Sequence, residues 1–310
     1  MGRNSKWIKG RSGDATQRIA RRALAARLER TWHYLERSVC EPPSETENVH
    51  QLRVFARRTA AALEIFDAWL PVRRGGWMRK QLKRIRKAAG EARDLDVLAL
   101  GWRQRDGQIP SAQTVLLLEQ VERCRRAAQR PIEEVFTKLC DKDFARRTYR
   151  FLRHVRARGG EHGDCERFGS MARLELGRLV APYLAAARAE MNDAHALHGF
   201  RIQGKQVRYA MEVFAGAFDA PFREELYPSV ADLQDRLGAI NDHVTAQAYL
   251  VAWREEADSC AARSALEASI EHERQSFESS RREFLAWWTA ERQDDLRRRF
   301  ARYVELDTAG

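Results

Sequence analysis

Basic residues recur at intervals of three and four in the segment HALHGFRIQGKQVRYAMEVF, residues 195–214. A residue advances about 100° around an α-helix, so a helix here has one cationic face opposite an apolar stripe. The cationic face comprises His198, Arg201, Lys205 and Arg208. Such a face can be a solvated surface, part of a catalytic site, or a surface that binds an anion.

Acidic residues are scarce on this face. We expect Glu212 to be its one acid, placed as an i+4 partner of Arg208. Because a solvated helix face normally mixes charges of both signs, the scarcity of acids favours binding of an anion.

The segment has a counterpart earlier in the chain. A shift of 148 residues places it on NVHQLRVFARRTAAALEIF, residues 48–66. His198 then falls on His50, Arg201 on Arg53, Lys205 on Arg57 and Glu212 on Glu64; at the same offset Gly238 falls on Gly90 and Asp242 on Asp94. A merely solvated face has no need for matching residues, so the sequence predicts a duplicated helical unit with two related cationic rows.

A second basic element follows the first row. The stretch RRGGWMRKQLKRIRKAAGEAR, residues 73–93, holds nine Lys or Arg and one acid, Glu91. Its periodicity exposes Arg79, Lys83 and Arg86, with Lys80, Arg84 and Lys87 on adjoining faces. Like charges at i and i+4 repel one another, so this run also favours a surface that binds an anion.

Composition and pattern predict an all-α protein. The chain has 310 residues, with 55 Lys and Arg against 44 Asp and Glu, a net charge of +11 that suggests an acidic partner. Strand signals are nearly absent. Helices are expected near 15–39, 46–69, 76–91, 94–105, 111–129, 142–157, 166–190, 193–219, 222–238, 241–256, 261–289 and 293–305.

The expected organisation is a basic, flexible N-terminus (1–14), a single domain (15–305) and a tail (306–310). The first helical half spans about 15–158 and the second about 166–305. The five cysteines are odd in number and form no CxxC pair, which indicates a reducing compartment. With no apolar leader segment and no long apolar run, we expect a soluble, cytoplasmic protein without membrane contact.

The two motif pairs resemble those of the CHAD family, the conserved histidine α-helical domain. VHQLRVFARR pairs with GEARDLDVLAL, and LHGFRIQGKQVRYAMEVF pairs with LGAINDHVTA. The resemblance covers roughly residues 15–305. It implies two four-helix-bundle-like halves related by pseudo-twofold symmetry around a basic cavity or pore. It also implies binding of inorganic polyphosphate, location at polyphosphate granules, and granule proteins as further partners.

The resemblance also implies the phosphate contacts. Those on the motif helices are His50, Arg53, Arg57, His198, Arg201, Lys205 and Arg208. Lys83, Arg84 and Lys87 are added because a basic helix is typical of the family, and Arg58 and Arg93 because they adjoin the motifs. The halves differ, since Ala60 stands opposite Arg208, Gln206 opposite Arg58, and Asn241 opposite Arg93. These departures reduce the number of cations that line the expected cavity.

Other functions are less favoured by the residues. We do not expect this protein to be an enzyme, because the chain has no Walker-type loop and no evident nucleophile. It also lacks the ExExK motif of the CYTH triphosphatase domain that many relatives carry ahead of the helical unit. We expect Asp94, Asp96 and Asp242 to cap a helix or pair with a cation. Cofactors and metals are not expected, since His154, His162, Cys165, His195 and His198 lack zinc spacing.

Nucleic acid remains the closest alternative partner, because a basic groove accepts any polyanion. Protonation of the histidines should tighten polyanion binding below about pH 6.5. The aromatics Trp287, Trp288, Phe300 and Tyr303 either close the core of the second half or form a docking surface.

Overall fold

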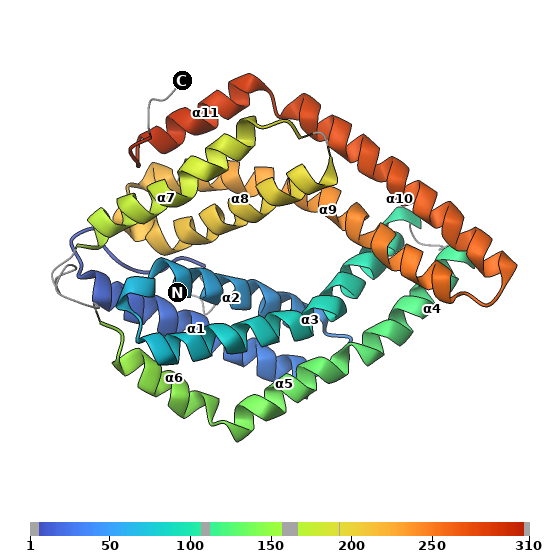
Figure 1. The fold of residues 1–310 in the computed structure, drawn as a ribbon, viewed down its shortest axis with the longest axis horizontal. Coiled ribbons are helices and arrows are strands. Elements are labelled where there is room, and N and C mark those ends of the chain that lie inside the picture. Colours follow the sequence, from blue (N-terminus) through green and yellow to red (C-terminus); the bar gives the residue numbers. More distant parts are fainter. Residues whose placement is uncertain (1–5, 107–111, 157–166, 192, 307–310) are drawn as a thin grey trace. The chain divides into compact units, whose positions relative to one another are not determined.

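The computed structural model of the chain describes residues 6–106, 112–156, 167–191 and 193–306 (Figure 1). Within these ranges the protein is all-α, as predicted, and the β structure consists of an isolated bridge between Ala15 and Arg167. No described helix is both long enough and apolar enough to cross a membrane.

Eleven α-helices lie in the described ranges. The first six are α1 (Thr16–Cys40), α2 (Thr46–Ile65), α3 (Val72–Asp106), α4 (Ala112–Ala127), α5 (Gln129–Asp141) and α6 (Phe144–Arg153). The others are α7 (Phe168–Arg188), α8 (Ala194–Phe214), α9 (Tyr227–Glu256), α10 (Cys260–Trp287) and α11 (Ala290–Ala301). Short 3₁₀ turns follow α2 (Asp67–Trp69) and α8 (Ala215–Ala217), and a π-helical turn (Phe222–Leu226) precedes α9.

Two expected helix breaks are absent. The helix α3 passes through Gly90, and α9 passes through Gly238, without interruption. A glycine inside a helix costs only about 1 kcal/mol, and the buried stripe of α3 continues beyond Gly90 through Leu95 and Leu98. The prediction of separate helices at 76–91 and 94–105, and at 222–238 and 241–256, was therefore wrong.

A further helix, α5, lies in the interval between the helices expected near 111–129 and 142–157. Pro131 does not prevent it, because it lies in the first turn of α5, where a missing N–H costs nothing. Ile132 and Leu139 of this helix are buried, which shows what holds it against the core.

The chain forms two compact units. Unit 1 comprises Met1–Ala172 and Glu212–Phe218, and unit 2 comprises Arg173–Met211 and Asp219–Gly310. The units are not continuous in sequence, because the last turn of α8 belongs to unit 1. The duplication, its symmetry and a shared basic cavity stay predictions.

In unit 1, α1, α2, α3 and α5 pack around an apolar core (Figure 1). A buried polar chain crosses this core: Arg125 donates to Asp96 at 2.9 Å and to Gln129 at 3.2 Å, and Gln129 donates to the Ser38 carbonyl at 2.7 Å. Burial raises the pKa of Asp96, while Arg125 acts against that rise. Asp96 thus pairs with a cation, one of its two expected roles.

Glu212 is a core residue rather than a surface acid. Its side chain is fully buried, and both its oxygens accept hydrogen bonds from Arg58 at 2.7 Å. The buried Arg27 approaches the same carboxylate at 3.3 Å. The expectation that Glu212 lies on an exposed face beside Arg208 was wrong, because the end of α8 packs into unit 1, where two arginines need a counterion.

The segment before α1 packs against this region, although it was expected to be flexible. Ile8 is buried, and its N–H donates to the Glu212 carbonyl at 3.2 Å. From residue 6 onward, the N-terminal segment therefore belongs to unit 1.

In unit 2, the C-terminal aromatics close the core. Trp288, Phe300 and Tyr303 are buried, and the Trp288 ring nitrogen donates to the Ala187 carbonyl at 3.1 Å. Trp287 is half-buried, with an arginine over its ring. These contacts favour the core interpretation over a docking surface.

Candidate anion-binding site

A basic groove runs between α2 and α3 in unit 1. Its volume is about 620 Å³, and it is lined by Arg53, Arg57, Ala60 and Glu64 of α2 and by Arg79, Leu82, Lys83, Arg86, Lys87, Gly90 and Asp94 of α3. Six cations thus face two acids. We call this feature the α2–α3 groove.

An arginine lies at each end of the groove. Each of these two arginines binds the opposite helix, or the turn that joins the two helices, and so closes that end. At one end, Arg53 of α2 donates to the Gly90 carbonyl of α3 and pairs with Asp94 at 3.3 Å. The Arg53 guanidinium lies close to the α3 backbone here, since a Cβ added at Gly90 would be 3.4 Å from it, in van der Waals contact. Asp94 therefore pairs with a cation and caps no helix.

At the other end, Arg79 of α3 donates to the Leu63 carbonyl at 3.1 Å and pairs with Asp67. These bonds cross the antiparallel helix pair. The two end arginines hold α2 and α3 at a fixed spacing and leave the middle of the groove to other cations.

The middle of the groove holds four cations without acidic partners. Among the described residues, no carboxylate lies within ion-pair distance of Arg57, Lys83, Arg86 or Lys87. Because unpaired like charges repel, an anion in the groove would relieve the repulsion among these four cations.

His50 lies one turn before Arg53 on α2. Burial lowers the pKa of His50 below its usual value, and the nearby cations, Arg93 first among them, lower it further. The lowered pKa favours the neutral imidazole, which can offer a hydrogen bond but no charge.

We expect the pKa of His50 to lie below about 6.5 in the free protein and to rise when an anion binds beside it. The native state holds this proton less tightly than the unfolded chain. The stabilisation from neutral His50 is therefore complete above about pH 6.5 and is lost as the pH falls below that value.

A bound anion offsets the repulsion that Arg93, Arg53 and Arg57 exert on protonated His50, which raises the pKa of His50. An NMR titration of the His50 ring, assigned with His50→Gln, measures both values, and a free-protein pKa at or above 6.5 would contradict this account.

The structure brings four of the predicted site residues together in the groove: Arg53, Arg57, Lys83 and Lys87. It does not bring Arg58 or Arg84 there. Arg58 pairs with Glu212, and Arg84, on another face of α3, donates to Gln81 at 3.2 Å. Arg93 is half-buried near His50.

The second predicted row lies on α8 in unit 2. Arg201, Lys205 and Arg208 are half-buried, and His198 is exposed. The His198 Nδ1 lies 2.9 Å from Oδ1 of Asn241, which stands at the repeat position of Arg93. The Asn241 amide orients His198 but carries no charge, whereas Arg93, at the equivalent position, places a positive charge beside His50.

Two lining residues, Arg79 and Arg86, were absent from the predicted set. The periodicity of α3 contains the signal that finds them, because both lie within about 60° of Lys83 around the helix, whereas Arg84 lies about 100° away.

Metal ligands do not cluster in the described part of the chain, where no group of three or more His, Cys, Asp or Glu is close enough to hold an ion. His162 and Cys165 lie outside the described residues.

Comparisons with known proteins place this geometry in a family. The CHAD domain profile matches residues 22–251. The crystal structure of the CHAD domain from the plant Ricinus communis superposes with a TM-score of 0.68 at 21% identity, covering 89% of this chain and 97% of that chain. PptA from Streptomyces chartreusis superposes with a TM-score of 0.63 at 19% identity, covering 89% of this chain and 99% of that one. A search of curated proteins finds no significant match. The profile match extends over more than half of the sequence, and the chain belongs to the CHAD domain family.

Proposed function

We propose that this protein binds inorganic polyphosphate in the α2–α3 groove, with the α8 row of unit 2 as a second contact surface. The observation that carries the proposal is the set of four cations without acidic partners, Arg57, Lys83, Arg86 and Lys87, between two arginines that are fixed at the groove ends. A cytoplasmic location at polyphosphate granules is part of the same proposal.

The chemistry of the groove suits a linear phosphate chain. Polyphosphate carries about one negative charge per repeating unit and presents only oxygens. Arg57 and Arg86 offer forked donors to these oxygens, and Lys83 and Lys87 offer point charges. Cations from two antiparallel helices can contact successive phosphates from both sides.

Nucleic acid fits the groove less well. Proteins that bind single strands combine cations with aromatic rings on which bases stack. Among the described lining residues of the α2–α3 groove there is no aromatic side chain. A competition measurement tests this preference: short DNA, at equal phosphate concentration, should fail to displace polyphosphate. Displacement would make the site a general polyanion surface.

Binding without turnover is also part of the proposal. The described lining residues include no serine, cysteine or histidine that could accept a phosphoryl group. Steady release of phosphate from long-chain polyphosphate would contradict this.

A variant with Arg57, Lys83, Arg86 and Lys87 changed to alanine should bind long-chain polyphosphate more than about a hundredfold more weakly, because it lacks four charge-assisted contacts. Binding is measured by calorimetry at constant salt. The four side chains have no acidic partners to lose, so the variant should fold normally, which circular dichroism checks.

The matched control removes four cations elsewhere: Arg130, Lys138, Arg178 and Arg298 changed to alanine. Each is exposed and pairs only with an acid on its own helix, and such surface pairs contribute little to stability. The control has the same net charge as the groove variant, so it should keep most of the affinity. Equal affinity in the two variants would defeat the assignment of the groove.

A further inference from the structure

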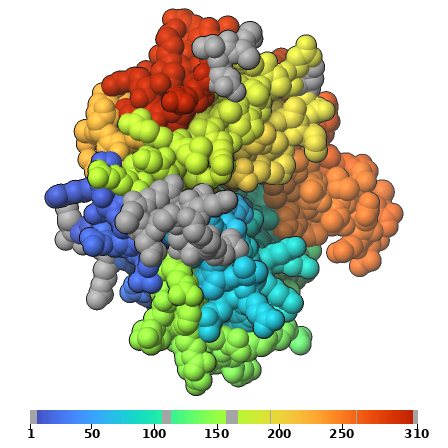
Figure 2. Space-filling view, turned by 60° about the vertical axis from the view of Figure 1, so that its left-hand side comes forward, coloured from blue at the N-terminus to red at the C-terminus, as the bar shows by residue number. Residues whose placement is uncertain are grey.

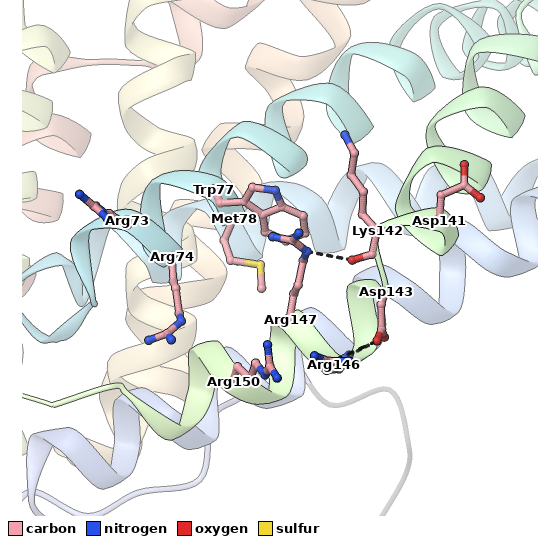
Figure 3. Close-up of a pocket in the computed structure, with 10 residues that line it drawn as sticks. All are labelled: Arg73, Arg74, Trp77, Met78, Asp141, Lys142, Asp143, Arg146, Arg147 and Arg150. Carbon is pink, nitrogen blue, oxygen red and sulfur yellow. Dashed lines mark hydrogen bonds and ion pairs between the residues drawn. The ribbon is translucent and has the colours of Figure 1, made fainter.

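A second cavity of unit 1 lies between the start of α3 and α6, with a volume of about 600 Å³ (Figure 3). In Figure 2 the start of α3 (light blue) and α6 (light green) lie against each other. The cations that line this cavity are Arg73, Arg74, Lys142, Arg146, Arg147 and Arg150. We call this cavity the α3–α6 pocket, and the proposed polyphosphate site uses none of these residues.

The pocket and the groove face different sides of α3. Relative to Arg79 in the groove, Arg74 is rotated by about 140° and Trp77 by about 160° around the helix axis. A polyphosphate chain in the groove therefore does not pass through the pocket, and a ligand of the pocket needs its own contacts.

Arg147 is held in place for anion binding. Its guanidinium lies over the Trp77 ring, 5.0 Å from the ring centre, and its Nε donates to the Lys142 carbonyl at 2.8 Å. Within the described residues, its two terminal nitrogens have no partner. A guanidinium that is already ordered loses little entropy when it binds a phosphate.

Two further guanidiniums face the same space. Figure 3 shows Arg74 of α3 and Arg150 of α6 on the two sides of the cavity, with Arg147 between the helices. No described carboxylate pairs with the side chain of Arg74 or Arg150. The two helices therefore present three guanidiniums to one cavity.

The acids of the pocket leave this charge largely uncompensated. Asp143, in a left-handed conformation with φ 50°, accepts from the Arg146 backbone N–H at 3.1 Å and caps α6. Its other oxygen lies 4.0 Å from the Arg146 side chain. Asp141 is exposed at the rim, which leaves an excess of positive charge.

We propose that the α3–α6 pocket binds a small ligand that carries a di- or triphosphate group. Three guanidiniums exceed the needs of a single phosphate but match the oxygens of two or three linked phosphates. The volume holds a molecule of nucleotide size, and the half-buried Trp77 with the buried Met78 supplies an apolar wall. An inorganic oligophosphate and a nucleoside triphosphate share this chemistry.

The test uses the full chain with the groove cations Arg57, Lys83, Arg86 and Lys87 already changed to alanine. Calorimetry with tripolyphosphate and with adenosine triphosphate should still detect binding that depends on Arg74 and Arg150. Adding Arg74→Ala and Arg150→Ala should weaken it about a hundredfold, since two charge-assisted contacts are lost. Both side chains are exposed and have no acidic partner, so this variant should fold. The control adds Arg130→Ala and Lys138→Ala instead and should bind as before.

The outcomes separate the two sites. Unchanged affinity after loss of Arg74 and Arg150, or no binding of either probe once the groove is removed, overturns the pocket proposal and leaves the polyphosphate groove standing. Long-chain polyphosphate that binds the groove variant at full affinity overturns the groove instead. Tighter binding of adenosine triphosphate than of tripolyphosphate, with the difference lost in Trp77→Leu, supports a nucleotide ligand. Equal binding of both probes supports an inorganic oligophosphate.

Discussion

Replacing Glu212 with alanine is expected to lower the free energy of unfolding by about 3–5 kcal/mol. The fully buried carboxylate accepts two hydrogen bonds of 2.7 Å from Arg58 and approaches the buried Arg27 at 3.3 Å. Without Glu212, the guanidiniums of Arg58 and Arg27 lose this carboxylate, which no longer offsets the cost of their desolvation. Urea denaturation followed by circular dichroism measures the change.

Glu64→Ala is the matched control, because Glu64 occupies the repeat position of Glu212 but is exposed. Its effect should stay within about 0.5 kcal/mol. Glu212→Gln keeps the shape of the side chain and removes its charge, so it should resemble Glu212→Ala. If Glu212→Ala were as stable as Glu64→Ala, the buried ion pairs would not stabilise unit 1.

The second large effect concerns salt. Polyphosphate affinity should fall steeply with ionic strength, because each phosphate contact releases counterions. By analogy with nucleic acids, the slope of log affinity against log salt should flatten by about 3–4 units when Arg57, Lys83, Arg86 and Lys87 become alanine. Between about 50 and 200 mM salt, the wild type should therefore lose about a hundredfold more affinity than the variant.

Calorimetry at several salt concentrations checks this slope. The control with Arg130, Lys138, Arg178 and Arg298 changed to alanine should keep nearly the wild-type slope, since none of these cations lines the groove. If both variants flattened the slope equally, net charge rather than the groove would govern binding.

The face of α3 that lines the groove could be predicted from the sequence. Gly90 and Asp94 belong to the repeated motif, and a rotation of 100° per residue places Arg79, Lys83, Arg86 and Lys87 on their side of the helix. Arg84 falls outside this face. The residues taken from this helix because a basic helix is typical of the family were Lys83, Arg84 and Lys87, a set that includes Arg84 and omits Arg79 and Arg86.

The burial of Glu212 could not be predicted from the sequence in this way. Glu64 and Glu212 share a repeat position, yet Glu64 lines the groove and Glu212 is buried. The difference arises from Arg27 and Arg58, which are 185 and 154 residues distant from Glu212 in sequence. No local pattern contains such a contact.

The α3–α6 pocket shows the same limit. The sequence RRTYRFLR predicts an amphipathic helix with Arg147 and Arg150 exposed, but it does not say that Arg74 of α3 faces them. Their meeting depends on how α5 and α6 return along α3.

The sequence alone determined the all-α class, because helical periodicity acts within one helix and is visible in the order of residues. Its two motif pairs also determined the family, through their resemblance to known members. Only the tertiary structure decided which cations lack an acidic partner, which acid is buried, and that the basic start of α3 lines a second pocket with α6. Those properties depend on which distant helix covers each face, and long-range packing determines that choice.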